Sequence, residues 1–237
     1  MDLSAPIYRL KREAKQLARQ SGCPLHEGLR RIAAREGYAS WSQLAARHAA
    51  EGVEHRLLAQ MAPGDLVLLA ARPGHGKTLL ALKMLIAAAK DRRRGAFFTL
   101  EYTQRDVTAL LADFAITVPA RAADVRFETS DAISATTITH GLKDAVPGML
   151  IVIDYLQLLD QDRRKPPLAE QIDLLQRFAA QTGAVVLCLS QIDRTYRAQK
   201  GRTPEWSDVR MPNPIDPGVF DKAFFLHDGA ITMQQAA

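Results

Sequence analysis

The chain has 237 residues, of which 47% are hydrophobic and 24% are charged, and its formal net charge is +5 at pH 7. This composition excludes a disordered or fibrous chain and is typical of a globular protein with one large core and a small accessory unit. Most of the excess charge lies at the front, where residues 1–56 hold ten Lys or Arg against six Asp or Glu. Such an excess is compatible with a polyanionic partner but does not demonstrate one.

The cysteines and the hydropathy predict a soluble, cytoplasmic protein. Cys23 and Cys188 lie far apart, and Cys188 falls in an apolar run typical of a buried strand, which fits a reduced chain better than a disulfide scaffold. No signal peptide is visible, because Arg9 precedes any apolar stretch. The longest apolar helix candidate, 79–89, contains Lys83 and is too short to span a bilayer. We therefore expect no membrane partner.

Three short helices are expected in the first domain, residues 1–56. Apolar residues recur at helical spacing in 6–20 and in 25–36, and a glycine follows each segment. A capping box at Ser40 predicts a third helix that begins at Trp41. These helices would form a small basic module that is barely stable alone. It could be a DNA-binding arm or a protein docking piece, and its basic face is equally consistent with plain solvation.

The second expected domain, residues 57–237, changes to apolar runs of strand length separated by helix-length segments. Continuous rather than alternating runs indicate strands buried on both faces, as in a parallel sheet with crossover helices. The expected strands span 65–71, 95–101, 148–154, 184–191 and 222–228. The expected helices span 79–90, 103–114, 136–146 and 168–181. The fold class is therefore α/β, a parallel-sheet core flanked by helices, with the small helical module in front.

The segment ARPGHGKT, residues 71–78, matches a P-loop set between a strand and a helix. In a P-loop, backbone N–H groups and the helix N-terminus surround the phosphates, the Lys supplies a cation and the Thr hydroxyl coordinates Mg²⁺. Ala71 replaces the usual leading glycine, which is tolerable where the backbone needs no positive φ. The expected ATP-binding residues are Arg72, Pro73, Gly74, His75, Gly76, Lys77 and Thr78.

Two carboxylates at strand ends extend this P-loop NTPase chemistry. Asp154 ends the run MLIVID, a Walker-B arrangement that places a carboxylate beside the Mg²⁺. Glu101 ends the run AFFTLE and is suited to orient and deprotonate the attacking water. Each residue also has an ordinary structural interpretation. Asp154 could be a helix cap or turn residue, and Glu101 could be a surface turn residue. The expected metal ligands are Thr78 and Asp154, and the expected cofactors are ATP and Mg²⁺.

Five segments resemble, in the same order, the ATPase domain of DnaB-like replicative helicases, a group with the RecA-like fold. They are PGDLVLLAARPGHGKTLLAL, FFTLEYTQRDV, LIVIDYLQLLD, VVLCLSQIDR and RTPEWSDVRMPNPIDPGVFDKAFFL. The resemblance covers roughly residues 57–228. It also accounts for Ala71, since the loop of that family begins with Ala-Arg-Pro.

The resemblance implies a role for each matched residue. Lys77 and Thr78 would bind phosphate and Mg²⁺, and Asp154 would be the second Mg²⁺ partner. Glu101 would be the catalytic base. Gln191 would be the sensor that reports the γ-phosphate state to nearby loops, although it otherwise reads as a polar residue at a strand end. The implied catalytic residues are Glu101, Lys77 and Gln191.

In this family, the loops after the Walker-B strand and after the sensor strand line a channel for single-stranded DNA. The corresponding segments here, 160–167 and 193–218, are charged and too long for plain connectors. The alternative is a pair of solvated charged loops. The implied nucleic-acid-binding residues are Arg163, Arg164, Lys165, Arg194, Arg197, Lys200 and Arg202.

The sequence departs from the family pattern at both ends. Family members continue past the last strand into a hairpin whose Lys and Arg reach the neighbouring subunit's ATP, and this sequence, truncated in comparison, ends at GAITMQQAA. Such an arginine contributes a factor of ~10³ to 10⁵ in rate. Without a substitute in trans, such as Arg202 or Arg210, hydrolysis is expected to be slow. The family's primase-interacting collar is also larger than residues 1–56.

Two functions fit these observations. The first is a DnaB-like ATPase that binds single-stranded DNA, assembles as a homo-oligomer (a hexameric ring or a short filament) and couples ATP hydrolysis to translocation or unwinding. The second is an ATP-dependent switch or adaptor with weak hydrolysis and no helicase activity. A small-molecule kinase is disfavoured because no acceptor-binding or lid segment is apparent. Subunit number and biological process stay open.

Overall fold

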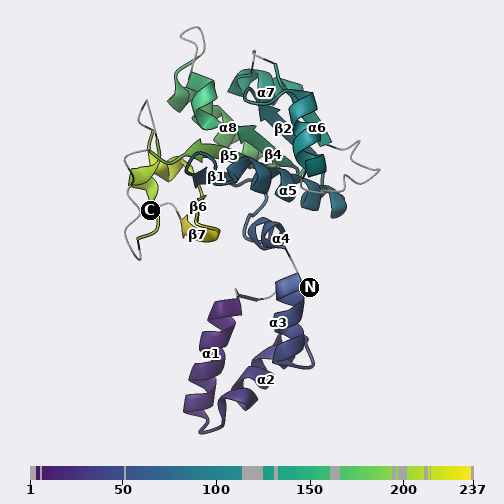
Figure 1. Cartoon of the computed structure of the whole chain (residues 1–237), viewed down its shortest axis with the longest axis vertical. Coiled ribbons are helices and arrows are strands. Elements are labelled where there is room, and N and C mark those ends of the chain that lie inside the picture. Colours follow the sequence, from purple (N-terminus) through teal and green to yellow (C-terminus); the bar gives the residue numbers. More distant parts are fainter. Residues whose placement is uncertain are drawn as a thin grey trace. The chain divides into compact units, whose positions relative to one another are not determined.

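The chain divides into two compact units, Met1–Ala59 and Gln60–Ala237, and each is described by itself (Figure 1). The boundary lies slightly later than expected because a short helix, α4 (Val53–Leu58), belongs to the first unit. The computed structural model describes residues 4–5, 7–50, 52–113, 125–130, 133–160, 166–193, 196, 202–210, 213 and 215–235.

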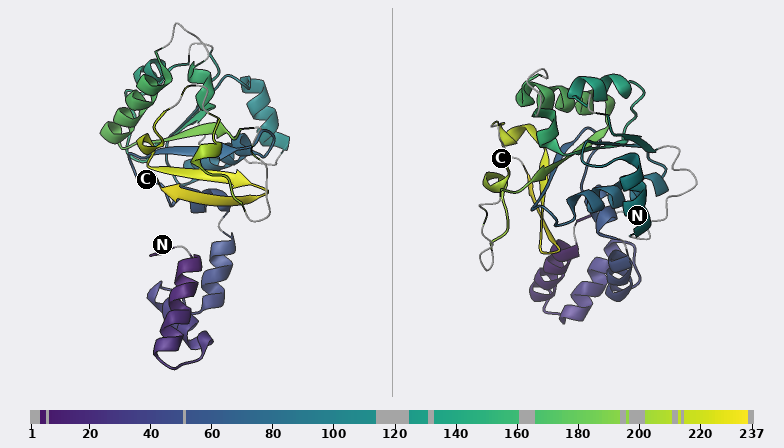
Figure 2. Two further views of the ribbon diagram at one scale, coloured as in Figure 1. Left: turned by 90° about the vertical axis from the view of Figure 1, so that its left-hand side faces the viewer. Right: turned by 45° about the horizontal axis from the view of Figure 1, so that its top comes forward.

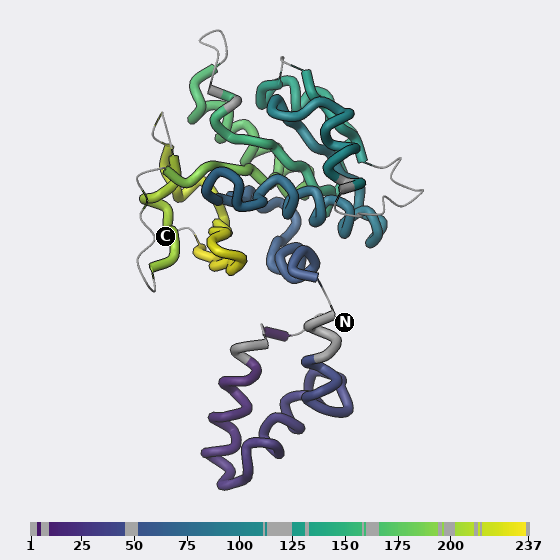
Figure 3. The backbone as a smooth tube through the Cα atoms, viewed as in Figure 1, coloured from purple at the N-terminus to yellow at the C-terminus, as the bar shows by residue number. Residues whose placement is uncertain are grey.

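The first unit is built on a pair of helices, α1 (Ile7–Gln20) and α2 (Leu25–Arg35), which lie side by side and are joined by a tight turn (Figure 3). Helix α3 (Trp41–Ala50) begins at the residue expected from the capping box, and the Ser40 hydroxyl accepts a hydrogen bond from the Gln43 N–H at 3.1 Å. The small core contains Leu10, Ala14 and Ile32, with Trp41 packed against it.

Helices α1 and α2 approach each other closely at Gly28. A Cβ atom at this position would lie 2.5 Å from the Ala14 carbonyl oxygen and 3.1 Å from the Ala18 Cβ. The glycine therefore fits here because of helix packing and not because of its backbone conformation.

The second unit contains a seven-stranded sheet in the order β3-β2-β4-β5-β1-β6-β7. The first six strands in this order run parallel, and β7 pairs antiparallel with β6. The strands are β1 (Leu66–Ala71), β2 (Gly95–Thr99), β3 (Val125–Glu128), β4 (Leu150–Asp154), β5 (Val185–Gln191), β6 (Lys222–His227) and β7 (Ala230–Gln235). Every residue of β1, β2 and β4 is buried, which explains their continuous apolar runs.

Helices cover both faces of this sheet (Figure 2). One face packs against α7 (Ala135–Gly141) and α8 (Leu168–Thr182), and the main core cluster joins their apolar side chains to alternate residues of the strands. Helix α5 (Lys77–Lys90) packs on the opposite face. The remaining elements are α6 (Gln104–Asp113), η2 (Leu156–Asp160), η3 (Trp206–Asp208) and η4 (Pro217–Val219).

The expected α/β core with a parallel sheet is confirmed, and two strands were not predicted. Strand β3 has only one buried residue, Val125, and β7 is half exposed along its length. Neither carries the continuous apolar run by which the other strands were recognised. Within the described ranges, no helix has the length and apolar character needed to cross a bilayer.

Candidate nucleotide-binding site

The expected phosphate and metal residues meet at the carboxyl edge of the parallel sheet. Thr99, at the end of β2, pairs with Asp154 at the end of β4, and Ala71, at the end of β1, pairs with Gln191 at the end of β5. Because the carboxyl ends of parallel strands lie at one edge, the segments that follow these residues leave the sheet together. Lys77 opens the helix after β1.

The loop between β1 and α5 takes its shape from two glycines. Gly74 has φ 78° and Gly76 has φ 84°, both in the left-handed region that favours glycine. A Cβ atom at either position would meet no atom of the described residues within 4 Å, so the constraint that these residues impose on the loop is conformational and not steric. Ala71 lies within β1 and is fully buried, and it is not among the residues with positive φ. A leading glycine is therefore not required.

The open end of α5 faces this loop. Gly76 caps the helix without a side-chain hydrogen bond, so the first N–H groups of the helix have no side-chain partner from the cap. These groups and the positive end of the helix dipole favour an anion. The His75 N–H, which was expected to face a phosphate, instead donates to the Arg72 carbonyl at 3.1 Å in this structure.

Thr78 and Asp154 form the centre of the site. The Thr78 hydroxyl donates to Asp154 Oδ2 at 2.9 Å, and both residues are buried. Asp154 Oδ1 is also buried, and it has no hydrogen-bond partner among the described residues. A buried carboxylate oxygen without a partner is costly, and a divalent cation with oxygen ligands would satisfy it. The residues present therefore fit Mg²⁺, which Thr78 and Asp154 would hold.

The electrostatics agree with a site prepared for a cation. Burial raises the pKa of Asp154 to about 6, while the Lys77 ammonium and the Thr78 hydroxyl oppose the rise and the Glu101 charge adds to it. Lys77 is itself buried, with its Nζ 5.6 Å from the centroid of the Tyr155 ring. A cation placed beside Asp154 would reverse the unfavourable burial of its charge.

Glu101 lies near this centre but is exposed to solvent. It follows β2, where its N–H donates to the Thr99 hydroxyl at 3.1 Å. Its negative charge contributes to raising the pKa of both Tyr102 and Tyr155, after burial as the main cause. The exposed carboxylate is therefore electrostatically coupled to the buried pair.

Gln191 is half-buried at the end of β5, on the other side of the Walker-B strand from Glu101. Its carbonyl accepts a hydrogen bond from the Arg210 N–H at 2.7 Å, which ties the end of the strand to the segment 209–210. The structure thus brings the sheet ends that carry Lys77, Glu101, Asp154 and Gln191 to one edge. Their catalytic roles stay predictions.

Two residues near the site were not singled out from the sequence. Tyr155 follows the Walker-B carboxylate directly, and its ring faces the Lys77 ammonium. Gln157 is buried and donates to the Ser190 hydroxyl at 2.8 Å and to the Arg210 carbonyl, so it connects η2 with β5. A polar residue inside the apolar run YLQLL was the available signal for Gln157.

Of the residues expected to bind nucleic acid, only Arg202 is among those the structure describes. Its guanidinium donates to Asp208 Oδ1 at 2.8 Å and lies 5.1 Å from the centroid of the Tyr196 ring. Phosphate binding by Arg202 would therefore compete with an existing ion pair. The residues that lie outside the described ranges are Arg163, Arg164, Lys165, Arg194, Arg197 and Lys200.

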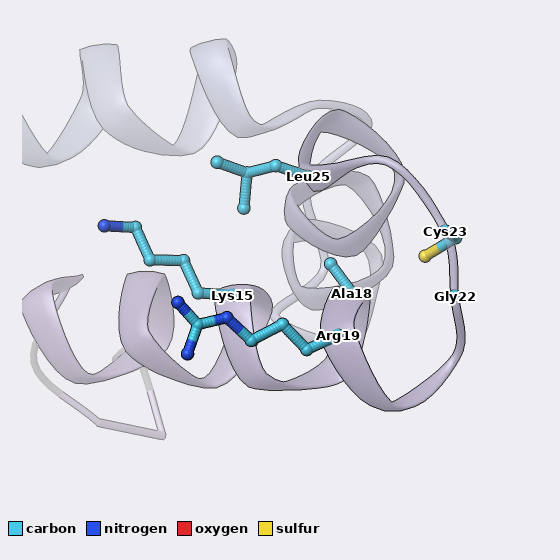
Figure 4. Close-up of a pocket in the computed structure, with 6 residues that line it drawn as sticks. All are labelled: Lys15, Ala18, Arg19, Gly22, Cys23 and Leu25. Atoms are coloured by element: carbon cyan, nitrogen blue, oxygen red, sulfur yellow. The ribbon is translucent and has the colours of Figure 1, made fainter.

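The first unit has a groove of its own, of about 410 Å³ (Figure 4). Lys15 and Arg19 of α1 extend along it, and Leu25 of α2 lies across from them. Ala18, Gly22 and Cys23 complete the lining. None of the expected phosphate-binding residues takes part in this groove.

Comparison with known proteins supports the assignment of the second unit. The family described as DnaB-like helicase C terminal domain matches residues 55–145 and 120–229, which together span most of the chain. The chain belongs to this family. The DnaB-like assignment agrees with the resemblance seen in the five sequence segments.

Among curated relatives, a replicative DNA helicase DnaB from Leifsonia xyli is 28% identical over 198 residues, which are 70% of this chain and 43% of the relative. A probable plasmid replicative DNA helicase from Chlamydia trachomatis is 24% identical over 188 residues, 66% of this chain and 41% of the relative. The chain thus spans less than half the length of these DnaB-like relatives.

Solved structures show the same fold. A DnaB-like replicative helicase, described with its interactions with primase, superposes with a TM-score of 0.57 at 18% identity and covers 95% of this chain and 74% of that one. A KaiC-like protein from Pyrococcus horikoshii gives a TM-score of 0.52 at 17% identity and covers 73% of this chain and 80% of that one. The second unit of this DnaB-like chain therefore has the RecA-like ATPase fold.

Proposed function

We propose that the chain is an ATP-binding ATPase of the DnaB-like motor type. The observation that carries the proposal is the buried Thr78–Asp154 pair beside the phosphate loop, in which one carboxylate oxygen has no hydrogen-bond partner among the residues that the structure describes. A structural hydrogen bond alone would not need this unsatisfied oxygen. A divalent cation that accompanies a triphosphate accounts for it.

Each residue has a task in this proposal. The N–H groups of the phosphate loop and of the first turn of α5 bind the phosphates, and Lys77 neutralises part of their charge. Thr78 and Asp154 hold Mg²⁺, which supplies positive charge to the reacting phosphate. Glu101 orients the attacking water and accepts its proton, and its exposed position leaves it accessible to water.

Binding of single-stranded DNA, assembly into a homo-oligomer and a cytoplasmic location belong to the same proposal. These proposals rest on membership in the DnaB-like family and on the charged segments 160–167 and 193–218. Translocation or unwinding is the finer proposal that follows from them.

A switch or adaptor with weak hydrolysis is the second candidate. It is favoured by the Arg202–Asp208 ion pair, because Arg202 is one of the two residues considered as an arginine finger acting in trans. A paired guanidinium is less available to a neighbouring subunit's ATP.

Calorimetric titration of the full chain with ATP and Mg²⁺ tests the binding step. The wild-type chain should bind nucleotide, and Lys77→Ala should abolish the binding. Lys90→Ala removes an exposed lysine from the other end of the same helix and should leave it unchanged. Equal affinity of the wild-type and Lys77→Ala chains would refute the proposed site.

Phosphate release separates the two candidates. A motor should turn over faster when single-stranded DNA is added, whereas a switch should keep an unchanged, very low rate. Glu101→Gln should lower any turnover by about 10²- to 10⁴-fold while ATP binding persists, since loss of a general base has effects of this size.

A further inference from the structure

Two histidines and an aspartate meet beside the phosphate loop, apart from the Thr78–Asp154 pair. One potential ligand atom from each of His75, His227 and Asp228 lies within 4.8 Å of the others. His75 belongs to the loop after β1, whereas His227 ends β6 and Asp228 begins the turn to β7. Strands β1 and β6 are neighbours, with Ala71 paired to Leu226, so the two segments leave the same edge of the sheet side by side.

The cluster is held in place by its aromatic rings. The imidazoles of His75 and His227 stack with centroids 6.0 Å apart and an interplanar angle of 5°. The Tyr196 ring meets His227 edge-on at 5.5 Å. The His227 side chain is only 13% exposed, so it forms the fixed member of the cluster.

Hydrogen bonding does not explain why His227 lies there. Its Nδ1 is buried and has no hydrogen-bond partner among the described residues, and its Nε2 lies 3.3 Å from Asp228 Oδ2. Because Nε2 is the nitrogen that faces Asp228, it is the atom available to an ion held by both residues. His75 places a second imidazole beside His227, and the turn between β6 and β7 does not need this imidazole for its own structure.

We propose that His75, His227 and Asp228 bind a divalent transition-metal ion, with Zn²⁺ as the representative. Imidazole nitrogens suit Zn²⁺, Cu²⁺ and Ni²⁺, whereas Mg²⁺ prefers oxygen ligands. Two imidazoles and one carboxylate are three of the four ligands of a tetrahedral zinc site, and the fourth position is open to water. This chemistry distinguishes the cluster from the oxygen-lined Mg²⁺ site at Thr78 and Asp154.

To close the site, the His75 ring must turn out of its parallel arrangement with His227, and the ligand atoms must move closer together. Zinc–ligand bonds of about 2.0–2.1 Å place ligand atoms roughly 3.3 Å apart, so atoms now up to 4.8 Å apart must approach by about 1.5 Å. Asp228 and Gly229 have φ 48° and 75°, the tight two-residue turn that fixes the backbone of the hairpin. The Asp228 side chain is 73% exposed and free to rotate toward the imidazoles.

Because His75 is part of the phosphate loop, a bound metal ion would affect that loop. His75 lies between Gly74 and Gly76, the two residues that set the loop's left-handed bends. An ion bound by His75 and His227 would therefore fasten the phosphate loop to the β6–β7 turn. This inference goes beyond the proposed ATPase function and does not depend on it, because the metal is bound without nucleotide.

Titration of the untagged full chain with Zn²⁺ tests the proposal. The chain is first stripped with EDTA, and the titration contains excess Mg²⁺ and no nucleotide. We expect one tight Zn²⁺ per chain. Loss of an outer-shell partner alone typically costs 10- to 100-fold in metal affinity, so loss of a direct ligand in His75→Ala should cost about 100-fold or more.

Three further variants keep the test specific. Asp228→Asn should weaken Zn²⁺ binding while it preserves the turn, because Asn also adopts the left-handed conformation. His140→Ala removes a histidine from α7, outside the cluster, and should leave the affinity unchanged. Asp154→Asn alters the proposed Mg²⁺ site and should also leave it unchanged.

The metal's own signal gives an independent readout. Co²⁺ added in place of Zn²⁺ should show the visible absorption of a low-coordinate site with nitrogen ligands, and His75→Ala should lose it. Equal Zn²⁺ affinity of the wild-type and His75→Ala chains would overturn the proposal, and so would loss of binding in Asp154→Asn. His75 and Asp228 are not core residues, so these variants carry the test even if His227→Ala fails to fold.

Discussion

Two carboxylates, one in each unit, show opposite ways to hold a negative charge. In the first unit, hydrogen bonds from Arg30 and Arg31 lower the pKa of the partly exposed Glu27 to about 2. In the second unit, burial raises the pKa of Asp154 to about 6. Glu27 is satisfied by its own helix, whereas Asp154 Oδ1 finds no hydrogen-bond partner in the part of the chain that the structure describes. Unsatisfied burial, more than the presence of charge, is therefore the reason to propose Asp154 as a metal ligand.

The largest effect expected from this comparison is the pH dependence of the stability of the metal-free protein. The pKa of Asp154 is raised in the folded state from 3.8 to about 6, so the folded state holds this proton more tightly than the unfolded chain. The stabilisation of the folded state by this proton is complete below about pH 4 and is lost as the pH rises through about 6. A shift of this size corresponds to about 3 kcal/mol.

Denaturant unfolding in EDTA between pH 4 and 7 measures this loss. Asp154→Asn removes the charge and keeps an oxygen that accepts from Thr78, so it should be more stable than the wild-type chain at pH 7 and should lack this decline. Asp91→Asn, an exposed substitution after α5, serves as the matched control. A decline that persists in Asp154→Asn would contradict the assignment.

A smaller effect is expected from the close helix contact of the first unit. Gly28→Ala adds a methyl group 2.5 Å from the Ala14 carbonyl oxygen, so α1 and α2 must separate. Overpacking of this kind costs about 1–3 kcal/mol, which exceeds the gain of roughly 1 kcal/mol in helix propensity. Thermal unfolding followed by circular dichroism should show a lower midpoint for the first unit.

The control for this change is Gly22→Ala. Gly22 has φ 62° and no neighbour within 4 Å of a Cβ, so it tests backbone strain without a clash. A stability of Gly28→Ala equal to or above that of the wild-type chain would show that the helices separate without cost.

The smallest effect is expected from Glu27 itself. Glu27→Gln removes exposed ion pairs with Arg30 and Arg31, and pairs of this kind contribute little to stability because water and salt screen them. The unfolding midpoint at pH 7 and moderate salt should not change measurably. A clearly lower unfolding midpoint for Glu27→Gln would contradict the expectation that these ion pairs contribute little to stability.

The sequence was informative where chemistry follows from local order. The phosphate loop, Asp154 and most core strands were predicted because glycine spacing and continuous apolar runs are local signals. Contacts such as His75 with His227, or Arg202 with Asp208, depend on how distant or irregular segments fold back, so spacing alone did not reveal them. Strand β3 was missed because only Val125 in it is buried.

The two cysteines differ in a way that has practical use. Burial raises the pKa of Cys188 to about 12, so its thiol carries almost no thiolate at neutral pH, whereas Cys23 is partly exposed at the groove of the first unit. A maleimide dye should therefore attach to the first unit alone without any engineered residue. The natural chain thus already carries a single fluorescent reporter position for following this unit while nucleotide is added.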